Sequence, residues 1–325
     1  MNRTNKYCSR RITTILRAML LAILCPMAYS SAMAFDETTD VELTGKILSS
    51  GTATMAENAF DADAATYYRT TAADMQWVGL DLGARHVVTR ISYTPAPLSV
   101  GPDRMLLSLF EGANDSTFMD AVPLYLISET PTTGKSTTVD INVSRGFRYV
   151  RYVGGAGSYC NVAELQFFGH EGEGDDSRFY QVTNLPTLSI HVADGAVPTV
   201  RGEDFESRYT LIHEGGTMIQ EYPILTRVRG NFSATPPNKP YRVKFNDGKS
   251  HHIMKGSTTN ESPVKAKKWV LLNSYRDKTL MRNPVAWQVS RRVGPKFTPW
   301  NQPVDLILNG DYRGTYTIAD QVTVH

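Results

Sequence analysis

The stretch that decides the fold begins RVRGNFSATPPNKPYRVKF at residues 227–245, continues AKKWVLLNSYRDKTLMRN at 266–283 and closes PVDLILNGDYRGTYTIADQV at 303–322. Each part combines β-branched and aromatic runs with Gly, Pro or Asn, a pattern that predicts strands joined by turns. Asn309-Gly310 predicts a two-residue hairpin turn. Residues 277–293 have helical character and Gly294 is suited to end a helix. Pro284 either kinks this helix or lies at its first position behind Asn283.

Residues 179–325 are therefore predicted to form an α+β domain, an antiparallel sheet that carries one helix. The chain stops soon after the last predicted strand, so we expect this domain to be incomplete and to leave sheet edges exposed.

Positive charge is concentrated in the same region. Residues 226–296 contain 16 Lys or Arg and 3 acidic residues, a net charge of +13, whereas the rest of the chain after residue 34 carries −16. A basic surface on an otherwise acidic protein predicts an anionic partner, such as a nucleotide phosphate, a phosphorylated substrate or an anionic polymer. Most of the individual charges are nevertheless expected to be solvated.

Arg229-Gly230-Asn231 is the most suggestive point for anion binding. A predicted strand delivers the guanidinium of Arg229 into a Gly-Asn turn, whose backbone N–H groups can face an anion. Lys244 alternates with Arg242 on the next predicted strand and can point the same way. Arg229 and Lys244 are therefore the candidate phosphate clamps. The sequence contains neither a Walker A motif nor G-x-G-x-x-G.

Residues 1–34 read as a secretory signal peptide. They hold five basic residues and no acid, then the apolar run Ala18–Leu24 and the small-residue pattern Ala32-Met33-Ala34. The apolar run is too short to span a bilayer easily, and the residues before Cys25 argue against lipidation there. We expect a mature chain without a transmembrane segment, secreted or held at the cell envelope or surface. Export also argues against a nucleic-acid partner.

The remaining cysteine, Cys160, is then alone, so no intramolecular disulfide is expected. It lies beside a predicted strand without a His or Asn constellation, which favours a buried structural thiol over a nucleophile.

Residues 35–170 are predicted to be a β-sandwich. The runs WVGLDLG, VVTRISYTP, MLLSLFEG, STTVDINV, FRYVRYVG and VAELQFFG read as short strands, and no convincing helical period appears. Residues 171–178 are acidic and Gly-rich, and predict a flexible connector to the second domain.

An oxygen-rich loop precedes the first of these runs. Asp61, Asp63 and Thr66 offer the oxygens that hard cations prefer, and Glu164 completes the set if the last strand lies beside the loop. The spacing alone is equally compatible with an Asx-type turn.

Taken in order, AFDADAATYY, WVGLDLG, VVTRISY, FEGAN, FRYVRYVG and CNVAELQFFG resemble a discoidin-like (coagulation factor 5/8 type C) domain, a galactose-binding-like jelly-roll sandwich. The resemblance implies a structural calcium site and a carbohydrate- or surface-binding face. The implied calcium ligands are Asn58, Asp61, Asp63, Thr66, Ala163 and Glu164. Ala62 replaces the usual Gly, which strains the turn if its φ is positive. Candidates for the ligand face, each also open to a packing role, are Tyr67, Tyr68, Arg69 and Tyr159.

The quoted motifs of 179–325 resemble the N-terminal part of the CotH-like (spore coat protein CotH) kinase family. The resemblance implies an atypical kinase fold that binds ATP with a divalent metal and transfers phosphate to a protein acceptor. The family's Glu-Gln is Asp320-Gln321 in this chain, which puts a Lys–carboxylate contact in doubt. The family's catalytic aspartates lie beyond His325, so no catalytic residue is assigned and we expect this chain to be inactive. The alternative is a non-catalytic, calcium-stabilised, glycan-binding surface protein or adhesin.

Overall fold

The computed structural model describes residues 40–51, 53–213, 216, 218–254, 264–294 and 297–321. The predicted signal peptide, with Cys8 and Cys25, lies outside the described residues. Val41–His325 forms one compact unit. Within the described ranges, no helix is long and apolar enough to cross a membrane.

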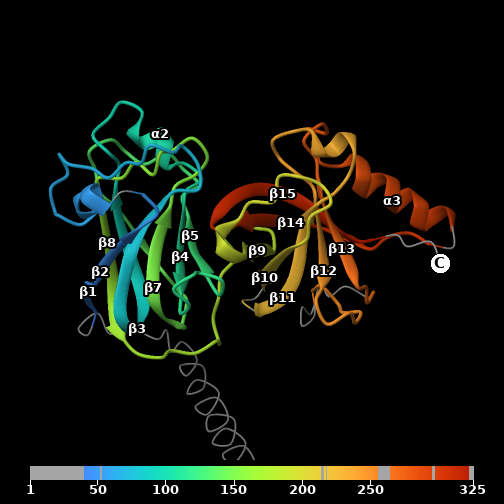
Figure 1. Cartoon of the computed structure of the whole chain (residues 1–325), viewed down its shortest axis with the longest axis horizontal. Helices are drawn as coiled ribbons and strands as arrows, with labels where there is room; N and C mark the ends of the chain where they lie inside the picture. Colours follow the sequence, from blue (N-terminus) through green and yellow to red (C-terminus); the bar gives the residue numbers. More distant parts are fainter. Residues whose placement is uncertain are drawn as a thin grey trace, which may run out of the picture. The chain divides into compact units, whose positions relative to one another are not determined.

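The first part of the unit is a β-sandwich, as predicted (Figure 1). Its strands are β1 (Val41–Leu43), β2 (Lys46–Ser49), β3 (Trp77–Thr94), β4 (Leu109–Ala113), β5 (Val122–Leu126), β6 (Thr137–Asp140), β7 (Gly146–Val153) and β8 (Glu164–Glu171). They follow the order β1-β8-β3-β7-β4-β5, and β2 and β6 also pair with β3. The first half of β3 pairs mainly with β7 and its second half with β8. This long strand therefore joins β1 and β8 on one side to β7, β4 and β5 on the other.

Two short helices interrupt the sandwich where the sequence showed no helical period. They are the 3-10 helix η1 (Ala53–Ala59) and the helix α2 (Gly101–Met105). Each is too short to display an apolar repeat. Pro102 lies in the first turn of α2, where its missing N–H leaves no helical hydrogen bond unmade. Met105, which the sequence placed in a strand, is the last residue of this helix, and the strand β4 begins at Leu109.

Aromatic rings fill the core of the sandwich. The ring of Phe110 lies 5.3 Å from that of Tyr152 and 6.0 Å from that of Phe167, both measured between centroids. Cys160 is fully buried, and this burial raises the pKa of its thiol. The side chain is therefore a packing element, as the sequence predicted.

The segment 171–178, predicted as a flexible connector, is hydrogen-bonded to the sandwich. The backbone N–H of Gly146 donates to the carbonyl oxygen of Glu173 at 2.9 Å. The side chain of Arg145 pairs with Asp176 at 2.6 Å. These contacts fix the course of the connector along the end of β7.

The second part is a closed barrel. Its strands are β9 (Thr187–Val192), β10 (Phe205–Ile212), β11 (Met218–Val228), β12 (Tyr241–Phe245), β13 (Lys268–Asn273), β14 (Asn301–Leu308) and β15 (Asp311–Asp320). They close in the order β10-β11-β12-β13-β15-β14-β9. All pairs are antiparallel except β9 with β14, which is parallel. That parallel pair closes the sheet, so the exposed edges expected for this domain are absent from the described strands of the barrel.

Side-chain alternation fills the barrel. Val228, Tyr241, Val243 and Leu271 are almost completely buried in its core. At the end of β14, Asn309 and Gly310 have φ values of 52° and 85°, which confirms the predicted hairpin turn.

The helix α3 runs from Arg282 to Val293 and ends at Gly294 in the left-handed conformation, as predicted. Its start differs from both predicted alternatives. Asp277 accepts a hydrogen bond from the backbone N–H of Arg282 at 2.8 Å and holds residues 277–281 as a turn. Pro284 therefore lies within the first turn of the helix without an Asn283 cap.

A buried ion pair links β4 to β7. Oε2 of Glu111 accepts hydrogen bonds from Nη2 and Nε of Arg151 at 2.7 and 2.9 Å, and Oε1 lies 3.2 Å from Nε2 of His191. Burial alone would raise the pKa of the fully buried Glu111, but the charges of Arg151 and His191 outweigh it and lower the pKa to about 2. The stability that this carboxylate contributes is therefore present above pH 4.5 and is lost as the pH falls toward 2.

We predict that Arg151→Met lowers the free energy of unfolding by about 3–5 kcal/mol, because it leaves a buried carboxylate without its main partner. Urea unfolding at pH 7 measures this change. The matched control is Arg148→Met, since Arg148 pairs with Asp81 at 2.8 Å with an exposed side chain, and its effect should be much smaller. Equal effects of the two substitutions would contradict the importance of the buried pair.

Candidate functional site

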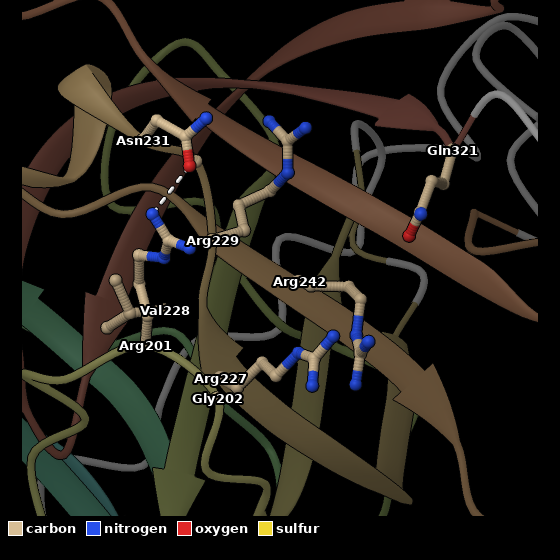
Figure 2. Close-up of a pocket in the computed structure, with 9 residues that line it drawn as sticks. Arg201, Gly202, Arg227, Val228, Arg229, Asn231, Arg242 and Gln321 are labelled. Atoms are coloured by element: carbon tan, nitrogen blue, oxygen red, sulfur yellow. Dashed lines mark hydrogen bonds between the residues drawn. The ribbon is translucent and has the colours of Figure 1, made fainter.

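A pocket rich in arginine lies on the outside of the barrel (Figure 2). Its volume is about 370 Å³. It is lined by Arg201, Gly202, Arg227, Val228, Arg229, Gly230, Asn231, Arg242 and Gln321. The four guanidinium groups come from three separate segments of the chain, namely residues 201–202, the end of β11 with its turn, and β12.

Strand pairing brings these side chains together. Arg227 on β11 lies directly opposite Arg242 on β12, while their neighbours Val228 and Tyr241 form the next pair and point into the core. Since successive side chains of a strand alternate between faces, both arginines point outward. Arg201 joins them because its backbone forms an isolated parallel bridge with Val228.

The chain turns sharply at the end of β11. Gly230 has a φ of 87°, a left-handed conformation that favours glycine. The turn carries Arg229 and Asn231 past the end of the strand, and Arg201 donates a hydrogen bond to the side chain of Asn231 at 2.5 Å (Figure 2). Arg201 is thereby held at the rim of the pocket.

The positive charges of the pocket are only partly balanced. Asp204 accepts a hydrogen bond from Arg242 at 2.6 Å and lies 3.7 Å from Nε of Arg227. A single carboxylate thus serves two arginines. Nε of Arg242 is buried without a hydrogen-bond partner among the described residues.

Arg229 has no acidic partner within the described ranges, and burial lowers the pKa of its guanidinium. A desolvated cation without a counterion attracts an anion strongly, because the charge is poorly screened. The pocket therefore has the charge and the donors required to hold a multiply charged anion.

Of the two predicted phosphate clamps, only Arg229 lines this pocket. Lys244 lies two residues beyond Arg242 on β12, opposite Leu225 and Lys268, and is not part of the lining. Arg227 and Arg242 were not among the predicted clamps, although their alternation with apolar residues places them on the face of Arg229. Arg201 gave no sequence signal, since only the folded chain brings it to β11.

The oxygen-rich loop does meet the last strand of the sandwich. The backbone N–H of Ala62 donates to Oε2 of Glu164 at 3.2 Å, and Oγ1 of Thr66 donates to Oδ2 of Asp61 at 2.7 Å. Ala62 has a φ of 60°, the strained conformation that the replacement of Gly implied. Asp63 accepts a hydrogen bond from the N–H of Ala65 at 3.0 Å, an Asx-type turn.

Two carboxylates lie close together in this loop. Desolvation, followed by the proximity of Asp61, raises the pKa of Glu164 to about 7. Oε1 of Glu164 is buried without a hydrogen-bond partner in the described part of the chain. Two carboxylates this close together suit a cation, although no group of three or more His, Cys, Asp or Glu side chains close enough to hold a metal occurs among the described residues.

The other two implied calcium ligands have different surroundings. Nδ2 of Asn58 donates to the carbonyl oxygen of Tyr67 at 3.3 Å. Ala163 is buried, and its N–H donates to the carbonyl oxygen of Thr94 at 3.0 Å. Both residues flank the loop of Asp61.

One of the four candidates for the ligand face is wrong. Tyr68 is fully buried, because its backbone pairs with Val162 and draws its ring into the core. Tyr67 and Tyr159 are half-buried and Arg69 is exposed. The guanidinium of Arg104, which the sequence did not single out, lies 4.8 Å from the centre of the Tyr159 ring.

Comparisons with known proteins match parts of the chain. The family model described as CotH kinase protein matches residues 226–325. No curated protein matches the chain. Among solved structures, the CBM62 module of Xyl5A from Clostridium thermocellum is 39% identical, covers 40% of this chain and 98% of its own, and has a TM-score of 0.39. The family 32 CBM of NanJ from Clostridium perfringens, solved with galactose, is 16% identical over 40% of this chain and 98% of its own, with a TM-score of 0.32.

These findings agree with the resemblance predicted from the sequence. Over residues 226–325 the chain is similar to the CotH kinase family, and over about 40% of its length it is similar in sequence to a carbohydrate-binding module.

Proposed function

We propose that this chain is a secreted or surface protein that binds a glycan through its sandwich and the phosphates of ATP through its arginine pocket. The proposal that the pocket binds ATP rests on the excess of guanidinium groups over carboxylates in it. Arg227 and Arg242 share Asp204, and Arg229 has no acidic partner among the described residues.

The positive charge of this pocket supports a nucleoside triphosphate as its ligand. Guanidinium groups bind phosphate oxygens through two parallel N–H donors, and such charge-assisted hydrogen bonds are stronger than neutral ones. Arg229 and Arg242 would contact the phosphates, and Arg201 would close the rim. Lys244, two residues beyond the lining residue Arg242 on β12, remains our second clamp candidate for the far end of the triphosphate.

ATP would enter with a divalent metal, which neutralises part of the phosphate charge during transfer to a protein acceptor. The described residues of the barrel would position and neutralise the phosphates. We assign none of them as the base that activates the acceptor.

We predict that ATP binds to the full chain and that Arg229→Gln weakens this binding by about 10- to 100-fold. A hydrogen bond to a charged group contributes about 1.5–3 kcal/mol, and 1.4 kcal/mol corresponds to a factor of ten. Isothermal titration calorimetry measures both affinities, with and without Mg²⁺. The matched control is Lys278→Ala, an exposed cation outside the pocket. Equal affinities of wild type and Arg229→Gln would refute the assignment.

Calcium is the structural cation that we propose for the sandwich. Asp61, Asp63 and Glu164 would supply carboxylate oxygens, Thr66 its hydroxyl, and Asn58 and Ala163 further oxygens, a donor set that suits Ca²⁺. The raised pKa of Glu164 supports this proposal, because a cation between Asp61 and Glu164 would relieve the repulsion that disfavours their ionised forms.

We expect EDTA to lower the melting temperature of the chain, because a cation that binds only the folded state stabilises it. Differential scanning calorimetry with added Ca²⁺ or EDTA measures the difference. Glu164→Ala should abolish it, whereas Asp140→Ala, at an exposed acid on β6, should preserve it. An unchanged melting temperature of the wild type in EDTA would exclude the calcium site.

The glycan-binding half of the proposal concerns the loops around Tyr159. The half-buried ring of Tyr159 lies beside Arg104, and the exposed Arg69 precedes Thr70, whose N–H donates to the carbonyl oxygen of Tyr159 at 2.9 Å. Together these groups offer stacking and hydrogen bonding to a sugar. The same loops favour the alternative function, a non-catalytic calcium-stabilised adhesin, which needs only the sandwich. Calcium and glycan binding without any ATP binding would favour that alternative.

We predict that Tyr159→Ala removes glycan binding without a change in ATP affinity. A glycan array measures the first property and calorimetry the second. Tyr180→Ala, at an exposed tyrosine outside these loops, is the control. If Tyr159→Ala binds the array as strongly as the wild type does, Tyr159 is not part of the glycan site.

A further inference from the structure

A second cavity adjoins the arginine pocket. Its volume is about 510 Å³. It is lined by Ser250, Val264, Lys265, Ala266, Lys267, Lys268, Phe297, Asp320 and Gln321. Gln321 lines both this cavity and the arginine pocket, so the two hollows are neighbours on the barrel surface. We call the second hollow the lysine cavity.

The lysine cavity carries three positive charges. Lys265 and Lys267 are exposed and Lys268 is half-buried, and none of the three belongs to an ion pair within the described ranges. Asp320 is the only acid of the lining. It is 5% exposed, it accepts a hydrogen bond from the N–H of Trp300 at 2.6 Å, and burial raises its pKa. The cavity therefore favours a ligand with negative charge.

Two further groups narrow the class of ligand. Oε1 of Gln321 is buried and accepts no hydrogen bond from any described residue, so it is suited to a donor such as a hydroxyl group. The side chain of Phe297 is 49% exposed at the rim of the cavity. An exposed aromatic ring can stack against the apolar face of a sugar.

We propose that the lysine cavity binds an acidic sugar, a saccharide unit that bears a carboxylate or a phosphate. The lysines would pair with the anionic group, Gln321 would accept a hydroxyl proton, and Phe297 would stack on the ring. This site lies on the barrel and is separate from the glycan loops of the sandwich. It does not depend on whether the arginine pocket binds ATP.

The test is a calorimetric titration of the full chain with an oligogalacturonate and with a neutral galacto-oligosaccharide of equal length. We expect the acidic oligomer to bind the wild type and the double variant Lys265→Ala/Lys267→Ala to lose at least tenfold in affinity. Binding should weaken as salt rises, because the partners are charged and exposed. The control double variant Lys249→Ala/Lys278→Ala removes the same charge outside the cavity and should bind normally. Gln321→Leu should also weaken binding, because it removes the hydroxyl acceptor.

A phosphorylated sugar, titrated in parallel, shows whether the cavity recognises a phosphate or a carboxylate. Binding of the phosphorylated sugar or of the oligogalacturonate supports the proposal. The proposal fails if neither acidic sugar binds, or if both bind equally to the wild type and the lysine double variant. It also fails if the double variant loses ATP and oligogalacturonate together, since the cavity would then be part of the nucleotide site. A loss of ATP binding in Arg229→Gln alone concerns the arginine pocket and leaves this proposal intact.

Discussion

Strand alternation in a closed barrel is the constraint on which the candidate anion site depends. Every second side chain of β11 and β12 must fill the core, and Val228, Tyr241 and Val243 do so. The side chains between them therefore face outward, and several of these are basic. The register places Arg227 opposite Arg242, so the pairing of β11 with β12 brings together two like charges, which repel each other. Asp204 offsets part of that repulsion, and the remainder favours an anionic ligand.

The sandwich shows the same relation between packing and charge on a smaller scale. The long strand β3 joins the strand sets, and the pairing of β8 with its second half brings Glu164 to the loop of Asp61. The two carboxylates are far apart in the sequence and are held together only by the fold. In contrast, Glu111 is buried but matched by Arg151, so it stabilises the sandwich without a need for a ligand.

Features that depend on neighbouring residues could be predicted from the sequence, whereas contacts between distant segments could not. The Asn309-Gly310 turn, the end of α3 at Gly294 and the burial of Cys160 each depend on neighbouring residues, and the structure confirms them. Arg229 was found because it precedes a Gly-Asn turn. Arg201 was not, because its contact with β11 depends on the whole barrel. Tyr68 was misjudged for the same reason, since only its pairing with Val162 shows that the loop is drawn inward.

The central claim is that the arginine pocket of the barrel binds the phosphates of a nucleotide. The most direct measurement is a crystal structure of the full chain with a non-hydrolysable ATP analogue and Mg²⁺. Our account predicts phosphate oxygens within hydrogen-bond distance of the guanidinium groups of Arg229 and Arg242. A bound analogue whose phosphates contact neither residue would contradict it.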